Sequence, residues 1–314
     1  MKNCLIALAA ASLALAAQAQ DTKVAIGMSG WTGFAPLTLA LQAGLFKKHG
    51  LDASIKKIPQ KDRHLAIASG DIQCAATTVE TWIVWNANGV ATTQIFQLDK
   101  SFGADGMVVK AGINSIKDLK GKTVAASAPG TAPYFTLAWM LAKNGLTLKD
   151  VTIVNLEPQA AANAMIAGTA NLDAAMTYEP FLSAVRAKPE AGKIIATTLD
   201  YPMIMDTFGC TPKFLAEQPK AAQALAHAYF EALELIKTDP KKSFEIMGAD
   251  VKQTAEAFEN SQKFLRWQDK AANQKFFAGE HAAFSKEAAD LLLAAGIIKV
   301  LPDMSKLADT RFIK

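Results

Sequence analysis

The sequence predicts an α/β protein with two similar lobes and a helical C-terminal tail. An apolar strand that begins at Val124 passes through a loop containing Gly130 into an apolar helix. One hundred residues earlier, Val24 and Gly30 open a matching strand-loop-helix segment. From Phe214 onward, apolar residues recur at helical spacing almost to the end of the chain. Repeated strand-helix units followed by helices are typical of an α/β architecture.

Each strand of the first lobe is expected to be followed by a helix, and these strands are predicted at 23–28, 53–58 and 72–76. Pro36 opens the first helix, because proline suits a position whose backbone N–H has no helical partner. Asp62 is expected to cap the second helix, at about 62–68. Arg63 and His64 are expected to be solvated. They form the only basic cluster near a predicted strand end, so they would be candidate contacts if the ligand is an anion.

The chain is expected to cross between the lobes twice. Strand character at 90–98 is followed by a turn-rich passage in which glycines flank Asp105, and this indicates the first crossing. Residues 200–208 indicate the return crossing. The predicted domains are therefore 21–104 plus 206–314 for the first lobe and 105–205 for the second.

The tail after the return crossing is predicted to contain helices and no strand. The expected helices lie at 214–237, 240–247, 251–267 and 273–295. A sheet with parallel strands normally has both faces covered, so we expect this tail to wrap back on the first lobe.

Residues 1–20 have the features of a secretory signal peptide. Lys2 gives a positive start, an apolar run extends from Leu5 to Ala17, and a small-residue cleavage site follows. Cleavage is expected near Ala19 or Gln20. A lipid-anchoring cysteine would follow the apolar run, whereas Cys4 precedes it. We therefore expect a soluble exported protein.

The composition indicates an ordinary globular protein, with 51% hydrophobic and 20% charged residues. The formal net charge of +4 is small, and no concentrated basic face is evident, so nucleic-acid binding is not expected. Cys74 and Cys210 would remain after cleavage and could pair in an oxidising compartment. Because Cys74 lies in an apolar strand pattern, two buried free thiols are the preferred expectation.

Small and hydroxyl-bearing residues follow the predicted strands. Ser29, Gly30 and Trp31 follow the first strand, and Thr77 and Thr78 follow the third. Ligands of open parallel sheets bind beyond the carboxyl ends of the strands, where helix N-termini also direct free N–H groups. We expect Trp31 to cover a ligand, with a role as a core aromatic as the alternative.

Several short segments carry a family resemblance: 31–36 (WTGFAP), 43–51 (AGLFKKHGL), 70–71 (GD), 115–122 (SIKDLKGK) and 178–180 (YEP). Together they resemble substrate-binding proteins of ABC importers of the nitrate/sulfonate/taurine type, related to the NMT1/THI5-like proteins. The resemblance covers essentially the whole chain after the signal peptide, and the segments are specific only jointly.

This resemblance implies a type II periplasmic binding protein fold, in which two Rossmann-like lobes are joined by two hinge strands. It also implies a small solute held between the lobes and delivery to a permease driven by an ATPase. A periplasmic location and a monomeric state are implied as well. The sequence has no metal-ligand spacing, no Ser-His-Asp arrangement and no Gly-rich phosphate signature, so no cofactor, metal site or catalytic residue is expected.

The resemblance places ligand contacts in the loops at the strand ends. The implied ligand-binding residues are Ser29, Gly30, Trp31, Thr77, Thr78, Glu80, Asp105, Gly130, Thr131, Tyr178, Glu179 and Phe208. For Glu179, capping of the following helix is an equal alternative.

The chemistry of these loops favours a nitrogen-containing solute. Glu80, Asp105, Glu179 and Asp206 bring carboxylates near aromatic side chains such as Trp31. Carboxylates and aromatic rings suit a cationic or nitrogen-rich ligand through charge-assisted hydrogen bonds and cation–π contacts. A sulfonate or taurine-type solute is the next candidate, since Arg63 and the helix dipoles would attract an anion.

Two other functions are weighed against uptake. The thiamine-precursor branch of the family includes enzymes, but none of His49, His64, His227 and His281 lies on the best-supported loops, so no enzyme is expected. A binding protein that reports to a chemoreceptor or a sensor kinase would close in the same way, and the sequence does not separate it from an uptake protein.

Overall fold

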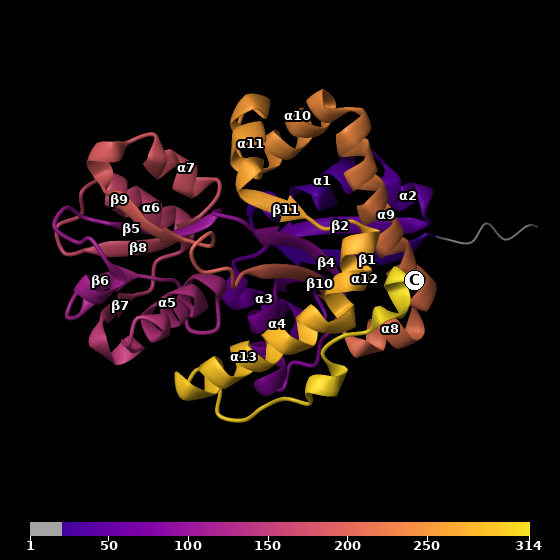
Figure 1. The fold of residues 1–314 in the computed structure, drawn as a ribbon. Helices are drawn as coiled ribbons and strands as arrows, with labels where there is room; N and C mark the ends of the chain where they lie inside the picture. The colour runs from indigo at the N-terminus through magenta and orange to yellow at the C-terminus, as the bar shows by residue number, and fades with distance from the viewer. Residues whose placement is uncertain (1–20) are drawn as a thin grey trace, which may run out of the picture.

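The computed structural model describes residues 21–314 and places them in two β-sheets flanked by helices (Figure 1). The six-stranded sheet has the order β11-β4-β10-β3-β1-β2, and the five-stranded sheet has the order β7-β6-β8-β5-β9. We call the first sheet with α1–α4 and α8–α13 lobe 1, and the second sheet with α5–α7 lobe 2. The predicted α/β class with a helical tail is confirmed, whereas the predicted signal peptide, residues 1–20, lies outside the described residues.

Lobe 1 contains elements from both halves of the chain. Its strands are β1 (Thr22–Met28), β2 (Leu51–Lys57), β3 (Cys74–Thr78), β4 (Thr93–Ser101), β10 (Met205–Cys210) and β11 (Leu265–Trp267). Its helices are α1 (Ala35–Gln42), α2 (Leu45–Lys48), α3 (Gln60–Ser69), α4 (Val79–Ala87), α8 (Pro212–Glu217), α9 (Pro219–Thr238), α10 (Pro240–Asp250), α11 (Ala255–Ser261), α12 (Lys270–Lys275) and α13 (His281–Ala294). β1, β2 and β3 are parallel, and β10 pairs antiparallel with both β3 and β4.

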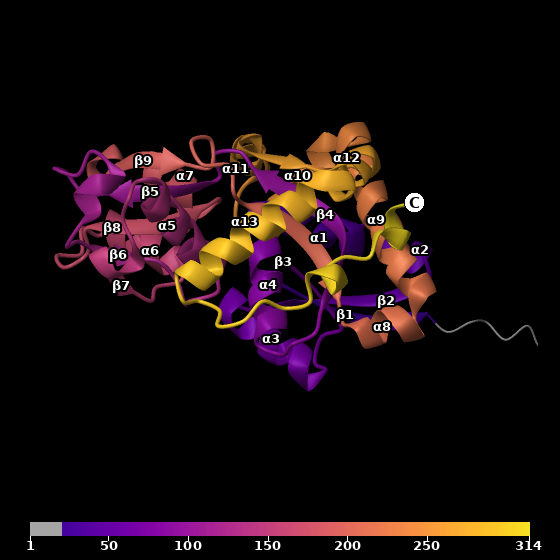
Figure 2. The ribbon, with the colours of Figure 1, turned by 60° about the horizontal axis from the view of Figure 1, so that its bottom comes forward.

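Lobe 2 is formed by the intervening part of the chain. Its strands are β5 (Asp105–Val109), β6 (Thr123–Ala125), β7 (Thr152–Val154), β8 (Ala174–Tyr178) and β9 (Lys193–Thr197), and its helices are α5 (Ala132–Lys143), α6 (Pro158–Ile166) and α7 (Phe181–Arg186). The chain crosses between the sheets after β4 and returns after β9. In both sheets, parallel strands that lead into helices end at the side that faces the other lobe (Figures 1 and 2).

Two local expectations for the chain are wrong. The predicted helix at 251–267 gives way to β11, where Leu265 pairs with Ser101 at the edge of β4. This pairing satisfies backbone groups at a sheet edge, and the pattern of the tail alone does not reveal it. Asp62 does not cap α3, because this helix begins two residues earlier, at Gln60, with Pro59 in the N-cap position.

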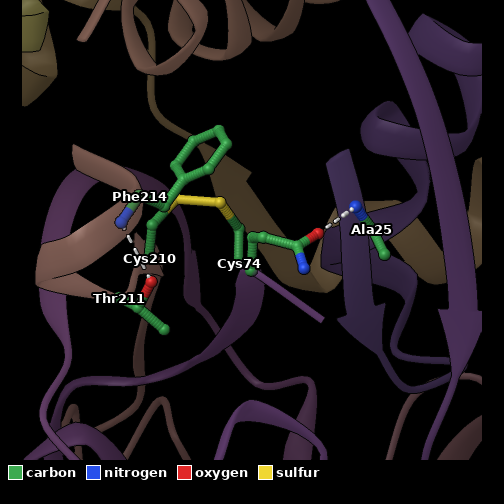
Figure 3. The surroundings of a disulfide bond; sticks show 6 residues. Ala25, Cys74, Cys210, Thr211 and Phe214 are labelled. Carbon is green, nitrogen blue, oxygen red and sulfur yellow. Dashed lines mark hydrogen bonds between the residues drawn. A yellow bond between two sulfur atoms is a disulfide. The ribbon is translucent and has the colours of Figure 1, made fainter. Parts of the chain in front are cut away.

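A disulfide joins Cys74 of β3 to Cys210 of β10, so the expectation of two free thiols is wrong (Figure 3). The two residues are 136 positions apart in the sequence but directly opposite each other in the antiparallel register. The sequence left this pairing open as the alternative, because a burial pattern gives no information about which strands become neighbours. The link fastens the returning chain to the centre of the lobe 1 sheet.

The C-terminal helix α13 packs on both lobes, and Figures 1 and 2 show it running from lobe 1 toward α5. Phe284 of α13 lies 6.0 Å from Trp139 of α5, measured between ring centroids, and both side chains belong to one apolar cluster that also includes Ile83 of α4. Lys143 of α5 also forms an ion pair with Glu287 of α13 at 2.9 Å. The tail therefore covers lobe 1, as expected, and also reaches lobe 2.

Candidate ligand-binding site

A pocket between the lobes takes residues from both sheets. It contains about 300 Å³ not filled by protein atoms, part of it open to solvent. The lining residues are Ser29, Trp31, Phe34, Gln60, Arg63, Thr78, Asp105, Ala132, Tyr178, Ile204 and Asp206. The cavity volume within this space is about 20 Å³, which is room for about one water molecule, so a solute would enter only when the lobes part.

The pocket lies where strands end. Ser29 and Trp31 follow β1, Thr78 ends β3, and Tyr178 ends β8 in the other lobe. The carboxyl ends of parallel strands are the usual ligand side of an open sheet. Trp31 and Tyr178 meet edge to face with ring centroids 5.4 Å apart, so one aromatic residue from each lobe borders the pocket.

Four buried carboxyl groups lie in or behind the pocket wall. Asp105 and Asp206 line the pocket, whereas Asp99 and Glu80 lie behind it. Asp99 accepts a hydrogen bond from Trp31 Nε1 at 3.3 Å and pairs in register with Asp206 across β4 and β10. Among residues 21–314, one oxygen each of Glu80, Asp105 and Asp206 is buried without a hydrogen-bond partner. Unpaired buried acceptors favour a ligand that supplies donors.

Burial makes these carboxyl groups hold protons tightly. It raises the pKa of Glu80 to about 8 and the pKa of Asp105 to about 7. The pKa of Asp206 is also raised, first by burial and then by repulsion from Asp99. Burial likewise raises the pKa of Asp99, although the hydrogen bond from Trp31 opposes this shift. A positive charge in the pocket would favour the ionised form of each group.

Arg63 is buried and lines the pocket, so the expectation that it is solvated is wrong. Its guanidinium donates to the carbonyl oxygens of Ile58 and Ala76, which fix it against β2 and β3. Burial lowers its pKa to about 10, so it is charged at neutral pH. Three of its five N–H groups are accounted for, and two remain for other partners. The pocket therefore has an acidic wall and one cation.

The structure brings together five of the residues implied by the resemblance, because Ser29, Trp31, Thr78, Asp105 and Tyr178 all line the pocket. The others of this set lie around it or away from it.

Thr77 and Glu80 lie next to lining residues of lobe 1, and Gly130 and Thr131 immediately precede the lining residue Ala132. Gly30 faces an adjoining cleft between α6–α7 and α10–α11. The left-handed φ of 84° at Gly130 and the closeness of Val84 explain the glycine there.

Phe208 and Glu179 lie outside the pocket lining. Phe208 is fully buried in the core of lobe 1, stacked on Phe96 with ring centroids 4.8 Å apart. Glu179 is also fully buried, pairs with Arg186, and accepts a hydrogen bond from the backbone N–H of Ser183 at 3.2 Å. This last contact satisfies a free N–H in the first turn of α7, although Pro180, and not Glu179, occupies the N-cap position.

Sequence reasoning left Gln60, Phe34 and Ala132 out of the site, although all three line the pocket. Gln60 directly follows the loop after β2, so the rule about strand ends could have selected it. No sequence pattern could have placed Asp99 behind the pocket, because its neighbours Trp31 and Asp206 come from distant parts of the chain.

Within residues 21–314, no group of three or more histidine, cysteine or acidic side chains is placed to hold a metal ion. In the same range, no helix is both long and apolar enough to cross a membrane.

Comparison with known proteins assigns the chain to a family. The NMT1/THI5-like family matches residues 31–243. A Brucella abortus protein described as a binding protein is 24% identical over 247 residues, which cover 77% of this chain and 75% of that protein.

Two solved structures share the fold. The alkanesulfonate-binding protein SsuA from Xanthomonas axonopodis pv. citri, bound to MOPS, has a TM-score of 0.78 at 18% identity, covering 93% of this chain and 100% of that one. The nitrate-binding protein NrtA from Synechocystis PCC 6803 has a TM-score of 0.72 at 17% identity, covering 93% and 86%. The chain therefore belongs to the NMT1/THI5-like family and has the type II periplasmic binding protein fold.

Proposed function

We propose that this protein is the solute-binding component of an ABC importer. It captures a small nitrogen-containing solute between its lobes in the periplasm and delivers it, as a monomer, to a permease and its ATPase. The observation that carries this proposal is the pocket between the lobes, lined from both sides and walled by Asp105 and Asp206, each with a buried unpartnered oxygen. A solute there would touch both lobes, so binding would favour closure.

The charges of the pocket favour a cationic nitrogen. Asp105 and Asp206 line it and Asp99 and Glu80 lie behind them, whereas Arg63 is the only cation among the lining residues. An ammonium, guanidinium or protonated ring nitrogen would supply donors to the unpartnered oxygens. It would also replace the protons that burial keeps on these groups.

Arg63 leaves room for an anionic group at the other end of the solute. One N–H of each terminal guanidinium nitrogen remains for a carboxylate or a sulfonate. The names of two structural relatives mention alkanesulfonate and nitrate, and a sulfonate or taurine-type solute is the next candidate. A bare anion is less suited, because it would meet Asp105 and Asp206 without a positive group to offset them.

Each lobe is proposed to move as one body. Lobe 1 comprises residues 21–104 and 206–314, and lobe 2 comprises residues 105–205. The two crossings of the chain between the sheets support these limits. A catalytic role is not proposed, because the pocket lining contains no histidine, cysteine or lysine.

A thermal-shift screen tests the proposed function. Amines, guanidines, pyrimidines, aminosulfonates, simple sulfonates and nitrate are added to the full chain, and its melting temperature is recorded. A ligand that binds only the folded state stabilises it by about 2.7 kcal/mol at a hundredfold excess over Kd. We expect solutes with a cationic nitrogen to raise the melting temperature, and sulfonates without one to leave it unchanged.

Asp206→Asn is the matched variant for this screen. It keeps the size of the side chain and removes the charge, so we expect the shift by a cationic solute to be lost. Asp200→Asn, at an exposed turn outside the pocket, is the control and should respond like the wild type. Stabilisation by nitrate or a simple sulfonate alone would contradict the assignment of a cationic nitrogen.

A further inference from the structure

We propose that Gln60 is a positioning residue that holds the two lobes together at the pocket, an inference that rests on the proposed capture of a solute by lobe closure. Gln60 is the first residue of α3 in lobe 1, and its side chain lines the pocket. Its amide makes hydrogen bonds to residues of both lobes.

On the lobe 1 side, Gln60 donates to threonine hydroxyls. Its Nε2 lies 2.9 Å from Thr77 Oγ1 and 2.9 Å from Thr81 Oγ1, and 3.4 Å from Thr78 Oγ1. An amide nitrogen has two hydrogens, so the two shorter contacts use its full donor capacity. Thr81 Oγ1 lies 2.8 Å from Thr78 Oγ1, and Thr78 donates to the buried carboxyl group of Glu80, so these hydroxyl groups connect Gln60 to the acidic wall.

On the lobe 2 side, Gln60 accepts from the start of α5. The backbone N–H of Ala132 donates to Gln60 Oε1 at 3.0 Å. Ala132 is the first residue of this helix, and Thr131 in the N-cap position makes no side-chain capping bond. Gln60 therefore supplies from the other lobe a capping acceptor that helices usually obtain from their own N-cap residue.

This contact exists only while the lobes are close. If the lobes separate, the hydrogen bond from the Ala132 N–H to Gln60 Oε1 breaks, and water can then bind both groups. Besides the edge-to-face contact of Trp31 with Tyr178, two polar contacts that cross near the pocket are longer. Thr81 Oγ1 lies 3.4 Å from the carbonyl oxygen of Gly130, and Lys61 lies 3.9 Å from Glu157 in a pair whose side chains are both more than a third exposed. Exposed ion pairs of that kind contribute little.

The same contact favours a cation over an anion in this part of the pocket. The N-terminus of a helix normally attracts anions through its free N–H groups. Here the first N–H of α5 is already bound by Gln60, and residue 133 is a proline with no N–H to offer. An anionic solute that uses the Ala132 N–H would have to displace Gln60, which would open the bridge between the lobes.

The test compares lobe separation in the wild type, Gln60→Met and Lys61→Met. Methionine keeps the length of glutamine and removes its donor and acceptor groups. Spin labels are attached at Lys188→Cys in lobe 2 and Lys241→Cys in lobe 1, both exposed, and the distance between them is measured without solute by double electron-electron resonance. Circular dichroism of each variant checks that it is folded.

We expect Gln60→Met to lower the ratio of closed to open molecules about fivefold or more, so that the longer distance gains population. The affinity for any solute found in the screen should fall by a similar factor. Lys61→Met, with the same new side chain at the next position, should keep the wild-type distances. Unchanged distances in Gln60→Met, or equal lengthening in Lys61→Met, would overturn the assignment.

The two proposals fail in different ways. If no solute stabilises the wild type but Gln60→Met still lengthens the distance, the role of Gln60 stands and the proposed function fails. If solutes stabilise the wild type but Gln60→Met keeps the wild-type distances, the proposed function stands and the role of Gln60 fails.

Discussion

Glu80 shows how burial of one side chain links binding to pH. Its carboxyl group is 1% exposed, accepts a hydrogen bond from Thr78, and leaves its second oxygen without a partner among the described residues. Burial raises its pKa to about 8, so near neutral pH the folded protein holds a proton that the unfolded chain would release. A cation bound nearby would expel this proton, and cation affinity should therefore rise with pH.

Glu80→Gln is expected to flatten the pH dependence of stability. Because the pKa of Glu80 is raised in the folded state, its contribution favours folding at pH 4 and is lost as the pH rises toward 8. A pKa unit corresponds to about 1.4 kcal/mol, so the loss is on the order of several kcal/mol. Glutamine resembles the protonated carboxyl group and does not titrate.

Urea unfolding at intervals from pH 5 to 9 measures this effect. Glu190→Gln, the same change at an exposed position, is the control and should follow the wild type. An equal fall in the free energy of unfolding for wild type and Glu80→Gln would show that Glu80 does not hold the proton.

At the scale of elements, the loop between β1 and α1 fixes the geometry of the acidic wall. Trp31 reaches Asp99 of β4 only because Gly33 has no side chain. A Cβ at Gly33 would lie 2.2 Å from Asp99 Oδ2 and 2.2 Å from Trp31 Nε1. The glycine of this loop therefore permits close approach, and its role does not depend on an unusual backbone angle.

Gly33→Ala is expected to separate Trp31 from Asp99 and to cost about 1–3 kcal/mol in the free energy of unfolding, the usual range for forced overpacking. Gly30→Ala is the matched control, since a Cβ there meets nothing within 4 Å. Chemical denaturation followed by tryptophan fluorescence gives both values. Equal stability of the two variants would mean that the loop adapts without strain.

At the scale of the molecule, α13 makes the lobes interdependent. Phe284, Ala288 and Leu292 of α13 share one buried apolar cluster with residues of α4 in lobe 1 and α5 in lobe 2. On the other side of the molecule, α6–α7 and α10–α11 border a cleft. The apolar side resists separation because opening would expose its cluster to water, so we expect the lobes to open on the cleft side.

Phe284→Ala is expected to lower the free energy of unfolding by about 3 kcal/mol, because it leaves a cavity between α13 and Trp139. Lys286→Ala, on the exposed face of the same helix, should change it little. Because the cluster is shared, the wild type should unfold in one transition by circular dichroism and by fluorescence. Two separate transitions would contradict the proposed coupling of the lobes.

The family resemblance implied Asp105 and Tyr178 as site residues. The sequence by itself determined the α/β class, the helical character of most of the tail, and the strand-end loops that carry Ser29, Trp31 and Thr78. These features depend on local periodicity, on turn residues and on the rule that ligands lie beyond strand ends, and all of them act over short stretches of chain.

Only the tertiary structure decided the Cys74–Cys210 disulfide, the burial of Arg63, the hydrogen bond from Ala132 to Gln60, and the positions of Phe208 and Glu179 outside the pocket. Each of these depends on which strands become neighbours and on how the two lobes face each other. Packing between segments far apart in the chain sets both, and local sequence patterns do not encode it.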